Sequence, residues 1–327
     1  MAHDHHGHDH HDHDHHDHGA HAHGHAHSHG HHHHAPASFG RAFAIGIALN
    51  TIYVLAEIAY GLAAHSLALL SDAVHNAGDV LALAAAWGAA YLARRLPSAN
   101  FTYGLRRSSI LVALGNAMVL LIATGGIAWE ALYRLTVPTA VAADTIIIVA
   151  AIGIVINGAT AALFASGRKG DLNIRAAFQH MLADALVSAG VVAGGVLVLV
   201  TGWSVLDPLV ALAVSVAIVW GTWSTLRDSV RMALDGVPAG IDTGAVAAHL
   251  AAWPGVAAVH DLHIWPISTT ETALTVHLVH PEGPQDDTML HAVRASLHER
   301  FGIGHATIQL ETEDGACVCS LVDAPKA

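Results

Sequence analysis

Long apolar stretches alternate with short polar breaks between residues 39 and 235. Six of these stretches are long enough for a helix to cross about 30 Å of hydrocarbon. They cover residues 39–63, 66–92, 109–133, 142–165, 176–201 and 206–228. We therefore predict a mainly α membrane protein whose six transmembrane helices fill residues 39–235, with both ends of the chain on the same side of the membrane.

The apolar pattern ends near residue 238, where proline, glycine and charged residues become more frequent. Residues 243–253 and 286–301 have helical patterns, and residues 256–265, 270–280 and 306–311 have strand patterns. Only residues 266–269 separate the first two strand patterns, which indicates a hairpin. We expect residues 238–315 to form a cytosolic α+β domain of order αββαβ, similar to ferredoxin-like or metallochaperone-like domains, followed by a tail over residues 316–327.

The positions of the basic residues predict the orientation, because cytosolic loops of membrane proteins are enriched in them. On one side of the predicted membrane lie Arg41, Arg94, Arg95, Arg106, Arg107, Arg168, Lys169, Arg175, Arg227 and Arg231. Arg134 lies on the opposite side. This bias predicts cytosolic N- and C-termini. We expect an integral protein of the plasma (inner) membrane of a bacterium, surrounded by membrane lipid.

The composition limits the class of protein and of partner. Hydrophobic residues make up 53% of the chain and charged residues 12%, which is too apolar for an ordinary soluble enzyme. Much of the net charge of -12 comes from aspartates that precede residue 18. The charge therefore describes one tail, and we expect no nucleic-acid partner.

Residues 1–38 form a low-complexity segment in which histidine alternates with Asp, Gly, Ala and Ser. Because 19 of the 30 histidines lie between residues 3 and 34, this segment cannot build a packed core. We expect a disordered cytosolic tail whose imidazoles capture metal ions such as zinc, copper or nickel. The longest run is His31, His32, His33 and His34. A dispensable solubilising tail is the alternative.

The second apolar stretch carries a stripe of polar residues at helical spacing: Asp72, His75, Asn76 and Asp79. The fifth stretch repeats the spacing of His75 and Asp79 with His180 and Asp184. Ionised groups are costly in hydrocarbon, so they usually face a partner, a cavity or an ion. Two imidazoles and two carboxylates match the ligands of tetrahedral zinc and also suit cobalt, cadmium or iron less selectively. We predict that these two pairs form the transport metal site; helix–helix hydrogen bonds are the alternative.

Other polar residues in the apolar stretches are less specific. Candidates for lining a path or hydrogen-bonding to the ligands are Asn50, Glu57, Asp72 and Asn76. Asp207 and Pro208 open the sixth stretch. We expect Asp207 to cap that helix and Pro208 to occupy its first position.

Together these motifs resemble those of the cation diffusion facilitator family of divalent-metal transporters. The resemblance is carried by "SLALLSDAVHNAGD", "QHMLADAL", the "DP" of the sixth stretch and "VHDLHIW", and it covers about residues 40–315. It implies a homodimer that exports metal from the cytosol in exchange for protons. A histidine at the position of His75, rather than an aspartate, is associated with zinc-type members of the family.

The resemblance also implies a metal site in the cytosolic domain. Its ligands would fall at His260, His277, His305 and Glu311. Weaker candidates are His263, Cys317 and Cys319. The two cysteines are weak because they form C-x-C where eukaryotic members have C-x-x-C. Gln309 stands where bacterial relatives place a further histidine. We expect this site to be regulatory and to tighten the dimer.

The leading hypothesis is a secondary active transporter rather than an enzyme, namely a zinc/proton antiporter that works by alternating access. Metal ligands must lose their protons, so metal and protons compete for one site, and histidine titrates near physiological pH. One alternative is a membrane metal sensor or buffer that does not transport. Another is an intramembrane metalloprotease, which needs a motif such as H-E-x-x-H that the sequence lacks. The residues leave the choice among zinc, cadmium and cobalt open.

Overall fold

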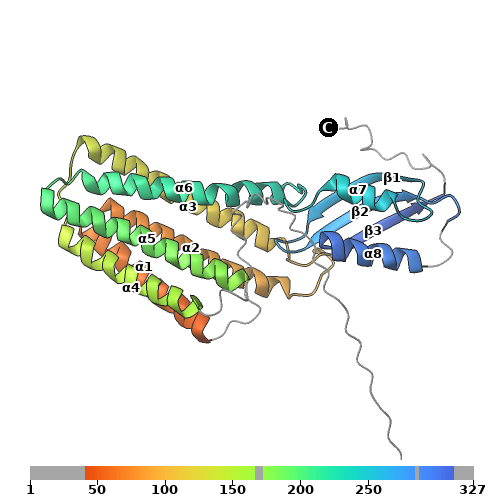
Figure 1. Ribbon diagram of the computed structural model, residues 1–327, viewed down its shortest axis with the longest axis horizontal. Coiled ribbons are helices and arrows are strands. Elements are labelled where there is room, and N and C mark those ends of the chain that lie inside the picture. Colours follow the sequence, from red (N-terminus) through yellow and green to blue (C-terminus); the bar gives the residue numbers. More distant parts are fainter. Residues whose placement is uncertain (1–40, 166–171, 284–286, 313–327) are drawn as a thin grey trace, which may run out of the picture. The chain divides into compact units, whose positions relative to one another are not determined.

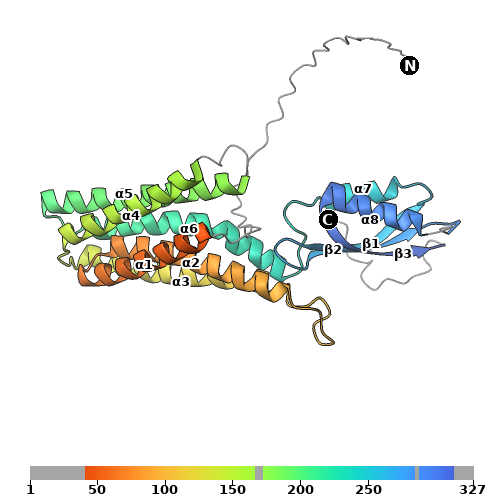
Figure 2. The ribbon, with the colours of Figure 1, turned by 90° about the horizontal axis from the view of Figure 1, so that it is seen from below.

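The structure is a computed structural model that describes residues 41–165, 172–283 and 287–312. The first part of the chain forms six long helices: α1 (Arg41–Ala63), α2 (Leu67–Ala93), α3 (Ser108–Thr136), α4 (Ala143–Ala165), α5 (Leu172–Thr201) and α6 (Leu206–Ala233). They fall on the six apolar stretches of the sequence. α4 packs along α5 and α3 along α6, while α2 contacts α1, α3, α5 and α6 (Figures 1 and 2). α2 is therefore the central helix of the group.

Large apolar side chains remain exposed on the outside of these helices, among them Ile122, Trp129 and Trp220. Within the described residues, four helical segments are long and apolar enough to cross a membrane: Ser108–Thr136, Ala143–Ala162, Phe178–Thr201 and Leu206–Ala233. Ile47–Ala63 of α1 is a shorter apolar helix. α2, which carries the polar stripe, is not among the four. The structure supports an integral membrane domain, and six spans stay a prediction.

A small α+β domain follows the helices. It consists of α7 (Thr243–Ala251), β1 (Ala258–Pro266), β2 (Thr272–Val279), α8 (Thr288–Phe301) and β3 (Ile303–Glu311). β1 and β2 are antiparallel, which confirms the predicted hairpin, and β3 lies parallel to β2. α7 and α8 cover one face of the sheet (Figure 2). Buried Leu250, Leu274 and Leu297 belong to the core of this domain.

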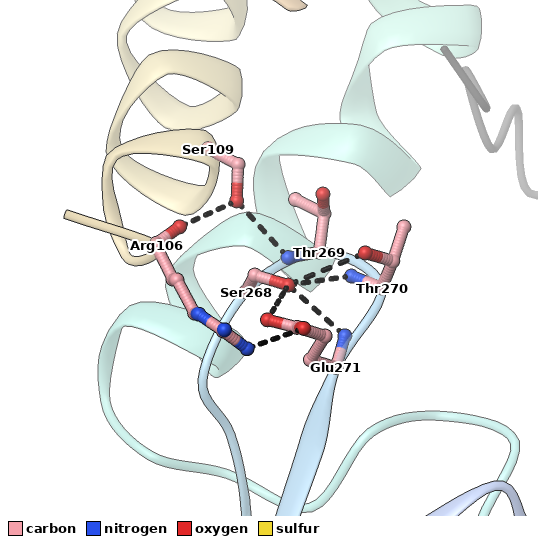
Figure 3. Close-up of polar contacts among 6 residues, drawn as sticks. All are labelled: Arg106, Ser109, Ser268, Thr269, Thr270 and Glu271. Atoms are coloured by element: carbon pink, nitrogen blue, oxygen red, sulfur yellow. Dashed lines mark hydrogen bonds and ion pairs between the residues drawn. The ribbon is translucent and has the colours of Figure 1, made fainter. Parts of the chain in front are cut away.

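The turn between β1 and β2 contacts the first turn of α3 (Figure 3). Within the turn, Ser268 Oγ accepts hydrogen bonds from the backbone N–H groups of Thr270 at 3.2 Å and Glu271 at 3.0 Å. Toward α3, the backbone N–H of Thr269 donates to Ser109 Oγ at 3.1 Å, and Arg106 pairs with Glu271 at 2.5 Å. The ion pair is exposed, so it stabilises the contact only weakly.

The prediction that Asp207 caps its own helix, α6, is wrong. α6 begins at Leu206 after Val205, which makes no side-chain cap, so Pro208 is the third residue of the helix and not the first as expected. The Asp207 carboxylate instead accepts hydrogen bonds from Ser66 Oγ and from the backbone N–H of Leu67, at the start of α2. The physical reason is that the first N–H groups of any buried helix need acceptors, and those of α2 lie within reach of this carboxylate.

Candidate metal centre

The structure brings His75 and Asp79 of α2 together with His180 and Asp184 of α5. Each imidazole faces a carboxylate of the other helix: His75 Nε2 lies 3.3 Å from Asp184 Oδ1, and His180 Nε2 lies 3.2 Å from Asp79 Oδ2. His180 Nε2 is also 3.7 Å from Asp184 Oδ2, on the next turn of its own helix. The two imidazole rings are 6.3 Å apart between centroids. All four predicted ligands thus converge, with their polar atoms facing one another.

The four side chains differ in their access to the surroundings. The Asp184 side chain is 2% exposed, whereas those of His75, Asp79 and His180 are 20–24% exposed. His75, Asp79 and Asp184 each offer a donor atom within 4.8 Å of the others. Asp184 is therefore the most buried member of the cluster, and the other three side chains are partly exposed.

A second polar layer lies against this cluster, and it includes three of the residues predicted to support the ligands. Ser188 Oγ donates to Asp72 Oδ2 at 2.7 Å, which joins α5 to α2. Glu57 of α1 accepts from Asn76 Nδ2 at 3.2 Å and from Tyr53 at 2.9 Å. Glu57 and Asp72 are fully buried. Their burial means that these carboxyl groups depend on the surrounding hydroxyl and amide donors.

Two residues of this layer, Tyr53 and Ser188, were not predicted from the sequence. Tyr53 precedes Glu57 by one helical turn, and Ser188 follows Asp184 by one turn, so helical spacing alone was an available signal. Asn50 is half-buried on α1 and, among the described residues, is not part of this hydrogen-bonded layer.

A second cluster lies on the sheet of the C-terminal domain. His260 and His277 are opposite each other on β1 and β2, and their ring centroids are 5.2 Å apart. Glu311, at the end of β3, reaches both: its Oε2 lies 2.9 Å from His260 Nε2 and its Oε1 lies 3.0 Å from His277 Nδ1. The cluster offers two imidazoles and a carboxylate to a metal ion.

Asp261 also belongs near this cluster and was not predicted. It lies at an irregularity of β1 with a φ of 51°, in the left-handed region that few side chains adopt. Its carboxylate is 3.0 Å from His263 Nε2 and 3.6 Å from His277 Nε2. Asp261 therefore links His263 to His277 of the cluster.

The structure does not bring His305 to the cytosolic cluster. His305 pairs with Ala273 near the start of β3 and packs edge-on against Tyr103. Since a strand rises about 3.3 Å per residue, the distance along β3 to Glu311 is about 20 Å. The remaining candidates, His31 to His34, Cys317 and Cys319, lie outside the described residues.

Comparisons with known families match nearly the whole length of the helical and α+β parts. The family model of the cation efflux transmembrane domain matches residues 43–233. The model of the cytoplasmic domain of cation efflux proteins matches residues 238–313. Both halves of the chain therefore agree on one family.

Three curated relatives are similar over most of their length. The metal cation efflux system protein CzcD of Cupriavidus metallidurans is 35% identical over 84% of this chain and 88% of its own. The cadmium, cobalt and zinc/H(+)-K(+) antiporter of Bacillus subtilis is 33% identical over 84% of this chain and 91% of its own. The zinc transporter ZitB of Escherichia coli is 32% identical over 82% and 86%.

Among solved structures, the metal-bound C-terminal domain of the CzcD transporter is 36% identical, covering 22% of this chain and 99% of that one with a TM-score of 0.21. The two family matches and the full-length relatives together show that the chain belongs to the cation diffusion facilitator family, as a zinc-type member.

Proposed function

We propose that this protein exports divalent metal ions, zinc first among them, from the cytosol in exchange for protons. The observation that carries the proposal is the meeting of His75, Asp79, His180 and Asp184 between α2 and α5. Four ligand atoms about 2.0 Å from a tetrahedral zinc lie about 3.3 Å apart. The two nitrogen-to-oxygen distances between the helices, 3.3 Å and 3.2 Å, agree with this spacing.

The charge of the site also suits a divalent cation. Two carboxylates supply two negative charges, and two neutral imidazoles add none, so a bound zinc ion is neutralised. In a site surrounded by apolar helices an uncompensated charge is costly, which favours this balance. The absence of a thiolate among these four residues leaves cadmium and cobalt as further substrates.

Proton exchange follows from the same four atoms. Without metal, the imidazoles and carboxylates can hold extra protons, as imidazolium or carboxylic acid groups, whereas zinc binds only their deprotonated nitrogen and oxygen atoms. Metal entry therefore displaces protons, and metal release lets them return. When the site opens alternately to the two sides of the membrane, this competition couples the two flows.

The orientation and the assembly belong to the same proposal. We place both termini in the cytosol because Arg94, Arg95, Arg106 and Arg107 lie on the side of the α2–α3 connection. We expect a homodimer, since the C-terminal domain matches the cytoplasmic domain of cation efflux proteins. Zinc bound by His260, His277 and Glu311 would then act as a regulatory ion that links metal supply in the cytosol to the dimer.

The test is metal flux in proteoliposomes with an imposed pH gradient, using dyes for zinc and for pH in the lumen. Wild type should move zinc and protons in opposite directions, and Asp79→Ala and Asp184→Ala should each abolish both signals. Asp144→Ala is the matched control, since Asp144 is an exposed carboxylate in the first turn of α4. Undiminished zinc-driven proton movement in both site variants would overturn the site. A wild type that binds zinc without moving it would favour a sensor or buffer.

A further inference from the structure

The Asp207 carboxylate of α6 holds the first turn of α2. Ser66 Oγ donates to its Oδ1 at 2.5 Å, the backbone N–H of Leu67 to its Oδ2 at 2.7 Å, and that of Ala68 to Oδ1 at 3.4 Å. Ser66 also accepts from the N–H of Leu69 at 3.1 Å. The free N–H groups at the start of α2 are thus satisfied by one residue of α6 and one cap of its own. We call Asp207, Ser66, Leu67 and Ala68 the Asp207 clasp.

Two further contacts hold the same end of α2. Arg134 of α3 donates to the carbonyl oxygen of His65 at 2.5 Å, and Ser71 Oγ donates to the carbonyl oxygen of Ala211 at 3.4 Å. His65 has a φ of 54°, which turns the chain sharply between α1 and α2. α3 therefore hydrogen-bonds to the turn between α1 and α2, and α6 hydrogen-bonds to the first turns of α2.

Packing is uneven along both helices of the clasp. From Ser66 to Ala73 every side chain except Leu70 is buried, whereas the described residues of α2 beyond Asp79 are half-buried or exposed, apart from Ala89. In α6, all of which is described, the buried residues run from Asp207 to Ile218 and are followed only by Ser229. The side chains of α2 and α6 are thus mostly buried near the N-terminal ends of both helices and mostly exposed or half-buried toward their C-terminal ends.

Building on the proposed transport function, we propose that Asp207 is a positioning residue for transport: the clasp is a fixed pivot about which α2 moves the metal ligands between the two sides of the membrane. His75 lies eight residues beyond Leu67, and a helix rises 1.5 Å per residue, so the ligands begin about 12 Å from the pivot. A fixed joint lets the far part of a helix swing without losing the alignment of its ligands.

The chemistry of the clasp favours a joint that stays closed. Asp207 is 2% exposed and Ser66 is fully buried. Separating them would leave a carboxylate without its donors in a site closed to water, which is strongly unfavourable. A gate that opens in every transport cycle would need a weaker or more solvated contact.

The first experiment compares Asp207→Asn with Asp144→Asn in the proteoliposome assay. The asparagine amide keeps one acceptor oxygen but has an NH2 group in place of the second carboxylate oxygen, so one hydrogen bond to the start of α2 is lost. Maximal zinc flux should therefore fall about tenfold. Zinc affinity, measured by calorimetry on detergent-solubilised protein that lacks residues 3–34 and carries His260→Ala/His277→Ala, should stay within about threefold, and Asp144→Asn should change neither quantity. Unchanged flux in Asp207→Asn, or zinc binding lost in proportion to flux, would overturn the positioning role.

A second experiment replaces the clasp by a covalent link. In a Cys317→Ser/Cys319→Ser background, Ser66→Cys/Asp207→Cys should show low flux when reduced and should regain flux when oxidised, because a pivot tolerates a permanent link. Loss of all flux in the oxidised, cross-linked protein would show that the contact must open and would overturn the pivot. If the parent protein moves no zinc at all, the proposed function fails instead, so the two ideas are separable.

Discussion

Ser188 offers a sharp test of the polar layer that supports the metal ligands. Its hydroxyl donates to Asp72 Oδ2 at 2.7 Å, and both residues are fully buried. Ser188→Ala removes a donor from a buried carboxyl group, and hydrogen bonds to charged groups contribute about 2 kcal/mol. For a domain of this size, the melting temperature should fall by about 4 to 8 °C.

The assay is thermal unfolding in detergent, followed by the fluorescence of the seven tryptophans. Ser215→Ala is the matched control, because Ser215 is buried on α6 and its hydroxyl has no hydrogen-bond partner among the described residues. Its loss should change stability by less than about 0.5 kcal/mol. In an Asp72→Asn background, Ser188→Ala should cost only about 1 kcal/mol, since the bond is then neutral. Equal shifts for Ser188→Ala and Ser215→Ala, or no coupling with Asp72, would refute the reasoning.

Three further predictions concern the C-terminal domain. Glu311→Gln should weaken zinc binding by that domain while leaving transport at saturating zinc intact. Calorimetry on a variant lacking residues 3–34 tests this, and unchanged zinc binding would contradict the assignment of Glu311 as a ligand. Leu274→Ala should lower the free energy of unfolding by about 2 to 5 kcal/mol because Leu274 is fully buried; a loss below about 1 kcal/mol would contradict the packing. Burial, with a smaller effect of nearby Arg300, lowers the pKa of His249 below its ordinary 6.5. On acidification the unfolded chain therefore binds a proton at His249 before the folded protein does, which lowers the free energy of unfolding. His249→Gln should reduce this loss of stability between about pH 7.5 and pH 5.5, and an unchanged pH dependence of melting would count against it.

The periodic features of the chain could be predicted because they depend on local spacing. Helix bounds follow from where apolar residues end, and the pairs His75/Asp79 and His180/Asp184 follow from the four-residue turn of a helix. The hairpin follows from two strand patterns with a short break. These patterns are written in consecutive residues, so the sequence shows them directly.

Features that depend on distant segments could not be predicted. Asp207-Pro208 has the local signature of a helix start, and only the packing of α2 against α6 reveals that Asp207 binds the other helix. His305 lies on the same strand as Glu311, but the parallel register of β2 and β3 places it beside Ala273, away from His277. Asp261 joins the cytosolic cluster because of an irregularity in β1, for which the sequence carries no clear signal.

The central claim is that two imidazoles and two carboxylates from α2 and α5 bind the transported metal. X-ray absorption at the zinc edge tests it most directly, on a variant that lacks residues 3–34 and carries His260→Ala/His277→Ala and Cys317→Ser/Cys319→Ser, loaded with one zinc per protomer. We predict four nitrogen or oxygen ligands at about 2.0 Å with imidazole scattering, lost when His75→Ala and Asp184→Ala are added. Sulfur ligands, or the same coordination after both replacements, would contradict the claim.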